Sequence, residues 1–249
     1  MSRKYTGSLI LAGMLGIAGA GGSARADGPP PLTAELDVSY LSAYVWRGQV
    51  YNDKGVVEPN FTLTRNGLSL NAWANYNAAG SYNGDNSQKF SEVDLTASYT
   101  RNVGPASLGI GIVQYLFPNQ TLTAADGSNT TAQAAPGTYE VYATAGLPNL
   151  PLAPTLTVYR DLDQASGFYA TFGISQTFTV STQVSAIVSA SIGAADREDN
   201  KYYFGKSTTA LNDANVGLAV PIAVANNLTV KPAVTYSFFP GTRIDSFSA

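Results

Sequence analysis

The chain of 249 residues contains neither cysteine nor histidine. Disulfides, thiol nucleophiles, Ser-His triads and the usual zinc sites therefore have no residues from which to form. Asp161 and Asp163 are close in sequence, but two carboxylates are too few for a calcium site, and we interpret them as turn residues. We accordingly expect no catalytic residues, no metal, no cofactor and no enzymatic activity.

Charged residues and long apolar runs are also scarce. Charged side chains make up 12% of the chain, against roughly 25% in soluble domains. After residue 26, no apolar run approaches the length of about 20 residues that a transmembrane helix needs. The 24 glycines and 15 tyrosines are plentiful, and this combination favours membrane-spanning strands over helices. The net negative charge and the lack of a basic patch predict that no nucleic acid is bound.

The first 26 residues have the pattern of an export signal. Arg3 and Lys4 precede an apolar run over residues 8–20, and residues 24–26 form an Ala-Arg-Ala cleavage site. Glycines interrupt the run, which is short for the alternative of a single membrane anchor. We expect export through the Sec pathway and cleavage after residue 26. The remaining domain, residues 27–249, would carry 11 basic and 17 acidic residues, a net charge of −6.

Apolar and polar residues alternate along eleven short stretches, as they do in strands with two different faces. The stretches cover residues 35–46, 58–65, 68–76, 90–100, 106–117, 139–145, 155–160, 168–178, 183–194, 213–223 and 228–238. Most have about the length that a tilted strand needs to cross a bilayer.

The connections between these stretches alternate between short and long. Asn66-Gly67 is a tight turn signal, whereas residues 77–89 and 118–137 form long polar connections. Up-and-down barrels of the bacterial outer membrane have short periplasmic turns at one rim and longer external loops at the other. The sequence therefore predicts an all-β, antiparallel, up-and-down transmembrane β-barrel.

A soluble antiparallel sheet would show the same alternation. The polar faces, however, carry Ser, Thr, Asn and Gly rather than the Lys, Glu and Arg of a solvated surface. Aromatic residues also gather near the ends of the strands, where membrane lipid would meet water. The residues that we assign to this membrane interface are Tyr40, Tyr44, Trp46, Tyr76, Tyr99 and Tyr236.

Bacterial single-chain barrels have even numbers of strands, and eleven is odd. About twelve strands are therefore expected, with the last one missing or incomplete. The terminal segment, residues 243–249, is too short to span a bilayer. We expect that the chain is C-terminally truncated, unless the weaker stretch at 139–145 or 155–160 is not a strand.

Two parts of the sequence resemble a known family. Residues 37–48, which include Tyr-Val-Trp-Arg-Gly, and residues 58–60, Glu-Pro-Asn, are similar to the start of the TorF-type family of porin-like bacterial barrels. Residues 211–218 and 230–236 resemble the penultimate strands of that family. The resemblance implies an outer-membrane barrel that continues into a closing strand, and it implies little about the solute.

Counting by twos along the first stretch places Trp46 on the lipid face and Arg47 on the inner face. Arg47 could pair there with Glu58, Glu92, Asp94 or Glu140, either for stability or to bias a pore. The alternation predicts the following charged residues in the lumen: Asp37, Arg47, Glu58, Glu92, Asp94, Glu140 and Lys231.

Two functions fit these observations. The first is a passive outer-membrane porin for small hydrophilic solutes or ions, with a weak cation preference from the acidic lumen. The second is a non-conducting barrel that acts as a scaffold or binds a partner through its loops. The second is favoured if inward-facing Trp73, Phe90, Tyr142 and Tyr169 fill the lumen. In both cases the expected partners are outer-membrane lipids and, for the porin, small solutes.

Overall fold

The computed structural model describes residues 8–19, 30–79, 87–119, 121–122 and 133–240. The predicted cleavage site at 24–26 and the terminal segment 243–249 lie outside these ranges. The central parts of the two long connections, 80–86 and 123–132, lie outside them as well.

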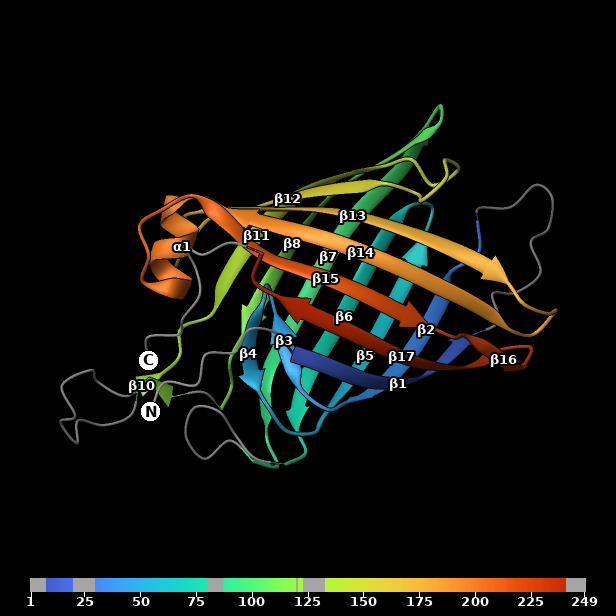
Figure 1. Cartoon of the computed structure of the whole chain (residues 1–249), viewed down its shortest axis with the longest axis horizontal. Coiled ribbons are helices and arrows are strands. Elements are labelled where there is room, and N and C mark those ends of the chain that lie inside the picture. Colours follow the sequence, from blue (N-terminus) through green and yellow to red (C-terminus); the bar gives the residue numbers. More distant parts are fainter. Residues whose placement is uncertain (1–7, 20–29, 80–86, 120, 123–132, 241–249) are drawn as a thin grey trace.

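The described chain is almost entirely β-structure (Figure 1). Its elements are β1 (Ser8–Gly19), β2 (Thr33–Leu41), β3 (Tyr44–Trp46), β4 (Gln49–Asn52), β5 (Val56–Arg65), β6 (Leu68–Asn77), β7 (Phe90–Val103), β8 (Ala106–Leu116), β9 (Thr121–Leu122), β10 (Gln133–Ala134), β11 (Thr138–Gly146), β12 (Thr155–Asp161), β13 (Phe168–Thr179), β14 (Ser185–Ala195), α1 (Arg197–Phe204), β15 (Ala210–Ala219), β16 (Ile222–Ala225) and β17 (Leu228–Phe238).

The main sheet follows the order of the chain. From one neighbour to the next it runs β2-β5-β6-β7-β8-β11-β12-β13-β14-β15-β17, and every pair is antiparallel. Short β16 continues β15 past Pro221, because Ala219 pairs with Ala233 and Ile222 pairs with Val230. Each of the eleven predicted stretches therefore contributes one strand, and the antiparallel up-and-down arrangement is confirmed.

The twelfth strand comes from the N-terminal part of the chain. β1 pairs antiparallel with β2 along one edge and with β17 along the other, so the order of neighbours returns to its start. We expected a twelfth strand after Phe238; the structure instead places the apolar run of the predicted export signal between β2 and β17. An apolar run without alternation gives no sign of a strand with one polar face, so this pairing could not be predicted from the sequence. Cleavage after residue 26, which would remove β1 from the mature chain, stays a prediction.

The two ends of the sheet differ as predicted. One end, the short-turn rim, holds tight connections, such as Asn66-Gly67, where φ is 51° and 81°. Positive φ at both residues defines the turn that matches the twist of a two-residue hairpin. The other end, the loop rim, carries α1 and the described ends of the two long connections, at residues 78–79 and 87–89 and at residues 117–119 and 133–137 (Figure 1).

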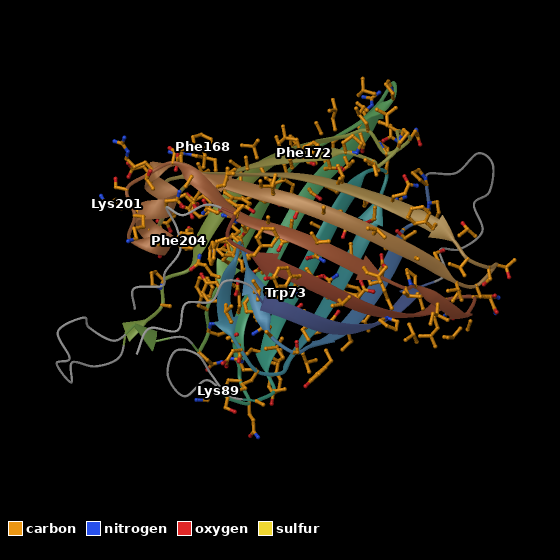
Figure 2. The ribbon with its side chains drawn as sticks, in the orientation of Figure 1. Trp73, Lys89, Phe168, Phe172, Lys201 and Phe204 are labelled. Carbon is orange, nitrogen blue, oxygen red and sulfur yellow. The ribbon has the colours of Figure 1, made fainter. Side chains whose placement is uncertain are left out.

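The outer face of the sheet is apolar, and the inner face is polar. Phe168 and Phe172 lie on the outside of β13, whereas Trp73 lies within the barrel (Figure 2). Other outward side chains with large exposed fractions are Leu70, Leu95, Ile110, Val188, Val216 and Leu218. No helix among the described residues is long and apolar enough to cross a membrane.

A β-bulge changes one predicted orientation. The register between β6 and β7 shifts near Asn75 and Tyr76, so Tyr76 pairs with Phe90 while Asn75 pairs with Glu92. The extra residue turns Phe90 outward, where it is 44% exposed and its ring lies 5.3 Å from that of Tyr76. The prediction that Phe90 faces the lumen is therefore wrong.

Candidate functional site

A short hairpin leaves the wall of the barrel between β2 and β5. The chain bends at Ser42 and Ala43, and β3 then pairs with β4 in a separate two-stranded sheet. The hairpin turns at Arg47 and Gly48, where φ is 46° and 81°. The predicted first strand, residues 35–46, thus ends at Leu41, because the bend breaks the alternation on which the prediction relied.

The hairpin crosses the interior toward the opposite wall. A Cβ atom at Gly48 would lie 3.0 Å from Cβ of Asp213 on β15, so with its positive φ this position requires glycine. Arg47 reaches residues of β11, β12 and β13, which lie about halfway around the sheet from β2. The turn of the hairpin is therefore held against the far side of the barrel, at the end that carries α1 (Figure 1).

Arg47 anchors the hairpin through a two-point ion pair. Its Nη1 and Nη2 atoms donate to Oε1 and Oε2 of Glu140 at 2.8 and 2.6 Å. The two side chains are only 7% and 1% exposed, and Oδ2 of Asp199 lies 3.7 Å from Nη1. Parallel hydrogen bonds between a guanidinium and a carboxylate fix orientation as well as charge. Of the four partners proposed for Arg47, the structure selects Glu140, and it adds Asp199.

Three aromatic rings surround the guanidinium of Arg47. Its Cζ atom lies 4.3 Å from the ring centre of Trp46, 5.0 Å from that of Tyr159 and 4.1 Å from that of Tyr169. Burial acts to lower the pKa of Arg47, but the Glu140 carboxylate outweighs it and holds this pKa above its ordinary value. The guanidinium therefore stays charged, and the rings add cation–π attraction.

Asp199 connects the anchor to α1. Burial raises the pKa of its carboxyl to about 7, although the nearby Arg47 charge acts in the opposite direction. Helix α1 begins at the N-cap Asp196, which accepts from the backbone N–H groups of Glu198 and Asp199, and it ends at Gly205 with a φ of 64°. This helix was not predicted from the sequence, although an Asp N-cap and a C-terminal Gly are recognisable helix signals.

Tyr44 and Trp46 do not face lipid as predicted. Tyr44 is buried, and its hydroxyl donates to Oε2 of Glu92 at 2.8 Å. Trp46 packs edge-on against Tyr203 of α1 at 5.0 Å and Tyr115 of β8 at 6.2 Å. Both residues belong to the inward hairpin and not to the outer wall, so their assignment to the membrane interface is wrong.

The other four interface aromatics keep their predicted outward orientation. Tyr40, Tyr99 and Tyr236 are 58%, 44% and 45% exposed, and Tyr76 packs against the outward-facing Phe90. Their contact with the membrane interface stays a prediction.

Buried amides attach the base of the hairpin to the wall. Asn52 donates to Oδ1 of Asn77 at 2.8 Å, and Asn75 donates to the same oxygen at 3.0 Å. Asn75 also donates to Oγ of Ser91 at 2.7 Å. Buried hydrogen bonds of this kind favour one arrangement of the hairpin over others.

The predicted lumenal charges all lie on inward strand positions or on the hairpin. Asp37 accepts from Asn60 on β5 at 3.4 Å, and Glu58 of β5 pairs across the sheet with Ser39 of β2. Asp94 pairs across the sheet with Trp73 and Tyr115. Lys231 lies near the start of β17, at the short-turn rim and away from the Arg47 anchor. The structure thus gathers Arg47, Glu140 and the aromatic rings into one site and leaves Lys231 apart from it.

Asp161 confirms its interpretation as a turn residue. Its Oδ1 atom accepts from the backbone N–H groups of Asp163, Ala165 and Ser166, and Oδ2 accepts from the Thr138 hydroxyl at 2.6 Å. Within the described ranges, no group of three or more His, Cys, Asp or Glu side chains is placed to hold a metal ion.

The strand order and the polar interior define the chain as an antiparallel β-barrel of the outer-membrane type. Its family is shown by residues 23–152, which match the model of Gcw_chp, described as a bacterial protein of unknown function. The chain belongs to this family. Among the curated proteins none matches it.

Solved structures with related architecture include outer-membrane barrels. A loop-deleted form of OmpT from Vibrio cholerae has 10% identity and a TM-score of 0.35, covering 94% of this chain and 99% of that one. OmpF of Salmonella typhi has 7% identity, a TM-score of 0.36 and coverages of 93% and 97%. The translocator domain of NalP from Neisseria meningitidis has 9% identity, a TM-score of 0.32 and coverages of 95% and 89%. These scores lie below 0.5, so the fold class is defined by the strand pairing of the chain itself.

Proposed function

We propose that the protein is an outer-membrane channel of the TorF-type porin class for small hydrophilic solutes and ions, closed at rest by its inward hairpin. One observation carries this proposal: residues 44–52 cross a polar interior and are fixed to the far wall by the ion pair of Arg47 with Glu140. Rings of charged side chains and narrow constrictions control conduction through membrane channels.

In the proposed orientation, the loop rim faces the cell exterior and the short-turn rim faces the periplasm. The hairpin then closes the outer half of the barrel, and solutes would pass when it undocks. The hairpin tip and α1 both contact the anchor, so the two would respond together.

A weak preference for cations remains part of the proposal. The inward set holds five carboxylates, Asp37, Glu58, Glu92, Asp94 and Glu140, against Arg47 and Lys231. Glu140 is paired with Arg47, so the remaining carboxylates would supply the bias when the hairpin is displaced.

The second candidate, a non-conducting scaffold, is favoured by the inward aromatic residues. Tyr142 and Tyr159 have ring centres 5.4 Å apart, and Tyr169 lies 6.1 Å from Tyr159. Together with Trp73 and the hairpin, these rings project into the interior and narrow it.

Single-channel recording in planar bilayers separates the two candidates. The test compares the wild-type barrel with a variant in which a short Gly-Ser linker replaces residues 44–52. We expect rare, small openings of the wild type and sustained, larger conductance of the variant. A variant that folds, as judged by heat-modifiable migration, yet stays silent would refute the channel and favour the scaffold.

A further inference from the structure

We infer that the interior holds a binding site for a small, uncharged, polyhydroxylated molecule, on the short-turn side of the hairpin. This inference rests on the proposed function only for the route by which the molecule would travel. The site is a cavity of about 270 Å³ between β12, β13, β14, β15 and β17. Its size lies just below the range of roughly 300–1,000 Å³ for small-molecule sites, which suits a small guest.

The lining of this cavity is rich in hydroxyl groups. Its polar side chains are Thr155, Ser175, Ser189, Ser191, Asn215 and Thr235. These positions pair across neighbouring strands, as Ser175 does with Ser189 and Ser191 does with Asn215, so they share the inner face. A hydroxyl both donates and accepts hydrogen bonds, which matches the hydroxyls of a sugar or polyol.

The same lining disfavours charged molecules. None of the residues that line the cavity, all within the described chain, carries a formal charge. A charged molecule would lose part of its hydration on entering the cavity and would meet no side chain of opposite charge among the lining residues. Its binding would therefore cost desolvation free energy that nothing offsets. The Arg47–Glu140 pair belongs to the anchor, and each member already neutralises the other.

One wall of the cavity is organised in advance. Asn215 donates to Oγ of Ser191 at 3.1 Å and to Oδ2 of Asp213 at 2.8 Å, and its Oδ1 accepts from the Ser237 hydroxyl at 2.5 Å. Asp213 in turn accepts from the Tyr169 hydroxyl at 2.8 Å. Fixed partners keep the amide oriented and lower the entropic cost of binding. They also join the cavity wall to Tyr169, whose ring contacts Arg47.

Gly173 offers a way to fill the cavity without disturbing the wall. A Cβ atom at this position would lie 3.8 Å from the Ala190 carbonyl oxygen and 3.9 Å from Ser191 Cβ, which are ordinary contacts. A larger side chain would therefore extend into the cavity. At Gly217, by contrast, a Cβ would lie 2.7 Å from the Ser189 hydroxyl, so that position cannot serve.

The test uses Gly173→Val, with Ala170→Val as the matched control on the outer face of the same strand. Valine suits a strand at both positions. Binding of glucose to the refolded barrel is followed by saturation-transfer NMR, with gluconate and glucosamine as charged counterparts of similar size. We expect glucose to bind the wild type and Ala170→Val, and its Kd to rise at least about tenfold in Gly173→Val.

Neither gluconate nor glucosamine should compete with glucose. The proposed site would be refuted if folded Gly173→Val bound glucose as tightly as the wild type. It would also be refuted if the wild type preferred either charged compound, or if the folded wild type gave no saturation-transfer signal with glucose. The experiment needs no conduction, so a silent channel leaves it intact. If the channel conducts but glucose gives no saturation-transfer signal, the binding site is refuted and the proposed channel function is not.

Discussion

Replacing Glu140 by glutamine should release the hairpin. The substitution keeps the size of the side chain but removes the charge that faces the Arg47 guanidinium, which is only 7% exposed. Breaking a buried ion pair by removing one partner costs about 3–5 kcal/mol. Asp199 at 3.7 Å from Arg47 offers partial compensation, so the lower end of this range applies.

A loss of about 3 kcal/mol changes the equilibrium between docked and undocked hairpin by roughly 100-fold, since about 1.4 kcal/mol corresponds to a factor of ten. Amide hydrogen exchange at Val45 and Val50, which pair within the hairpin, reports this opening directly. We expect exchange at both amides to accelerate by about two orders of magnitude in Glu140→Gln, while the amides of β13 are unaffected.

The control is Lys54→Gln. Lys54 and Asp53 form an exposed pair at 3.9 Å beside the hairpin, and such pairs contribute between about 0 and 1 kcal/mol. Exchange at Val45 and Val50 should therefore hardly change. A combined Arg47→Met, Glu140→Leu and Asp199→Asn variant should open less than Glu140→Gln, because it leaves no unpaired charge buried at the anchor. Unchanged exchange in Glu140→Gln would show that the ion pair does not hold the hairpin.

Three further predictions concern the loops and the helix. The Asp161→Asn substitution weakens the hydrogen bonds that the Asp161 carboxylate accepts from three backbone N–H groups, so we expect a lower midpoint in thermal unfolding. An unchanged midpoint would show that these hydrogen bonds do not stabilise the fold. Burial raises the pKa of Asp199 in the folded state to about 7, above its value of about 4 in the unfolded state. Between about pH 4 and 7 the folded state therefore binds a proton that the unfolded state has released, so the stability of α1 should fall as the pH rises through this range. Protection factors in α1, which are exchange rates corrected for their intrinsic dependence on pH, should fall with pH in this range in the wild type and not in Asp199→Asn. Protease added to intact cells should cleave within residues 77–89 or 118–137, and recovery of the protein in the soluble periplasm would contradict the proposed location.

The wall of the barrel is predictable from the sequence because its rules are local. Alternation along β6, β13 and β14 assigns each side chain to the inside or outside without knowledge of distant residues. Turn signals such as Asn66-Gly67 then fix where neighbouring strands meet. These local signals account for the eleven predicted strands and for the inward position of Glu140.

The candidate site depends on contacts that no local pattern contains. Arg47 and Asp199 are far apart in sequence and meet only because the hairpin and α1 fold to the same place. The bend at Ser42 and Ala43 also interrupts the alternation that was extended to Trp46. The extra residue of the β6–β7 bulge likewise reversed Phe90, since one inserted residue changes the face of those beyond it.

The hairpin has a mechanical consequence for the barrel. It joins the wall at β2 and β5 to the wall at β11 and β15, so it acts as a tie across the diameter. A sheet connected only to its neighbours can flatten when the surrounding bilayer presses on it, because each hydrogen-bonded pair can hinge slightly. With the tie in place, flattening must stretch or compress the contact between Arg47 and Glu140. In a bilayer, lateral pressure on the barrel and the docking of residues 44–52 would therefore be coupled through the contacts that Arg47 makes with the far wall.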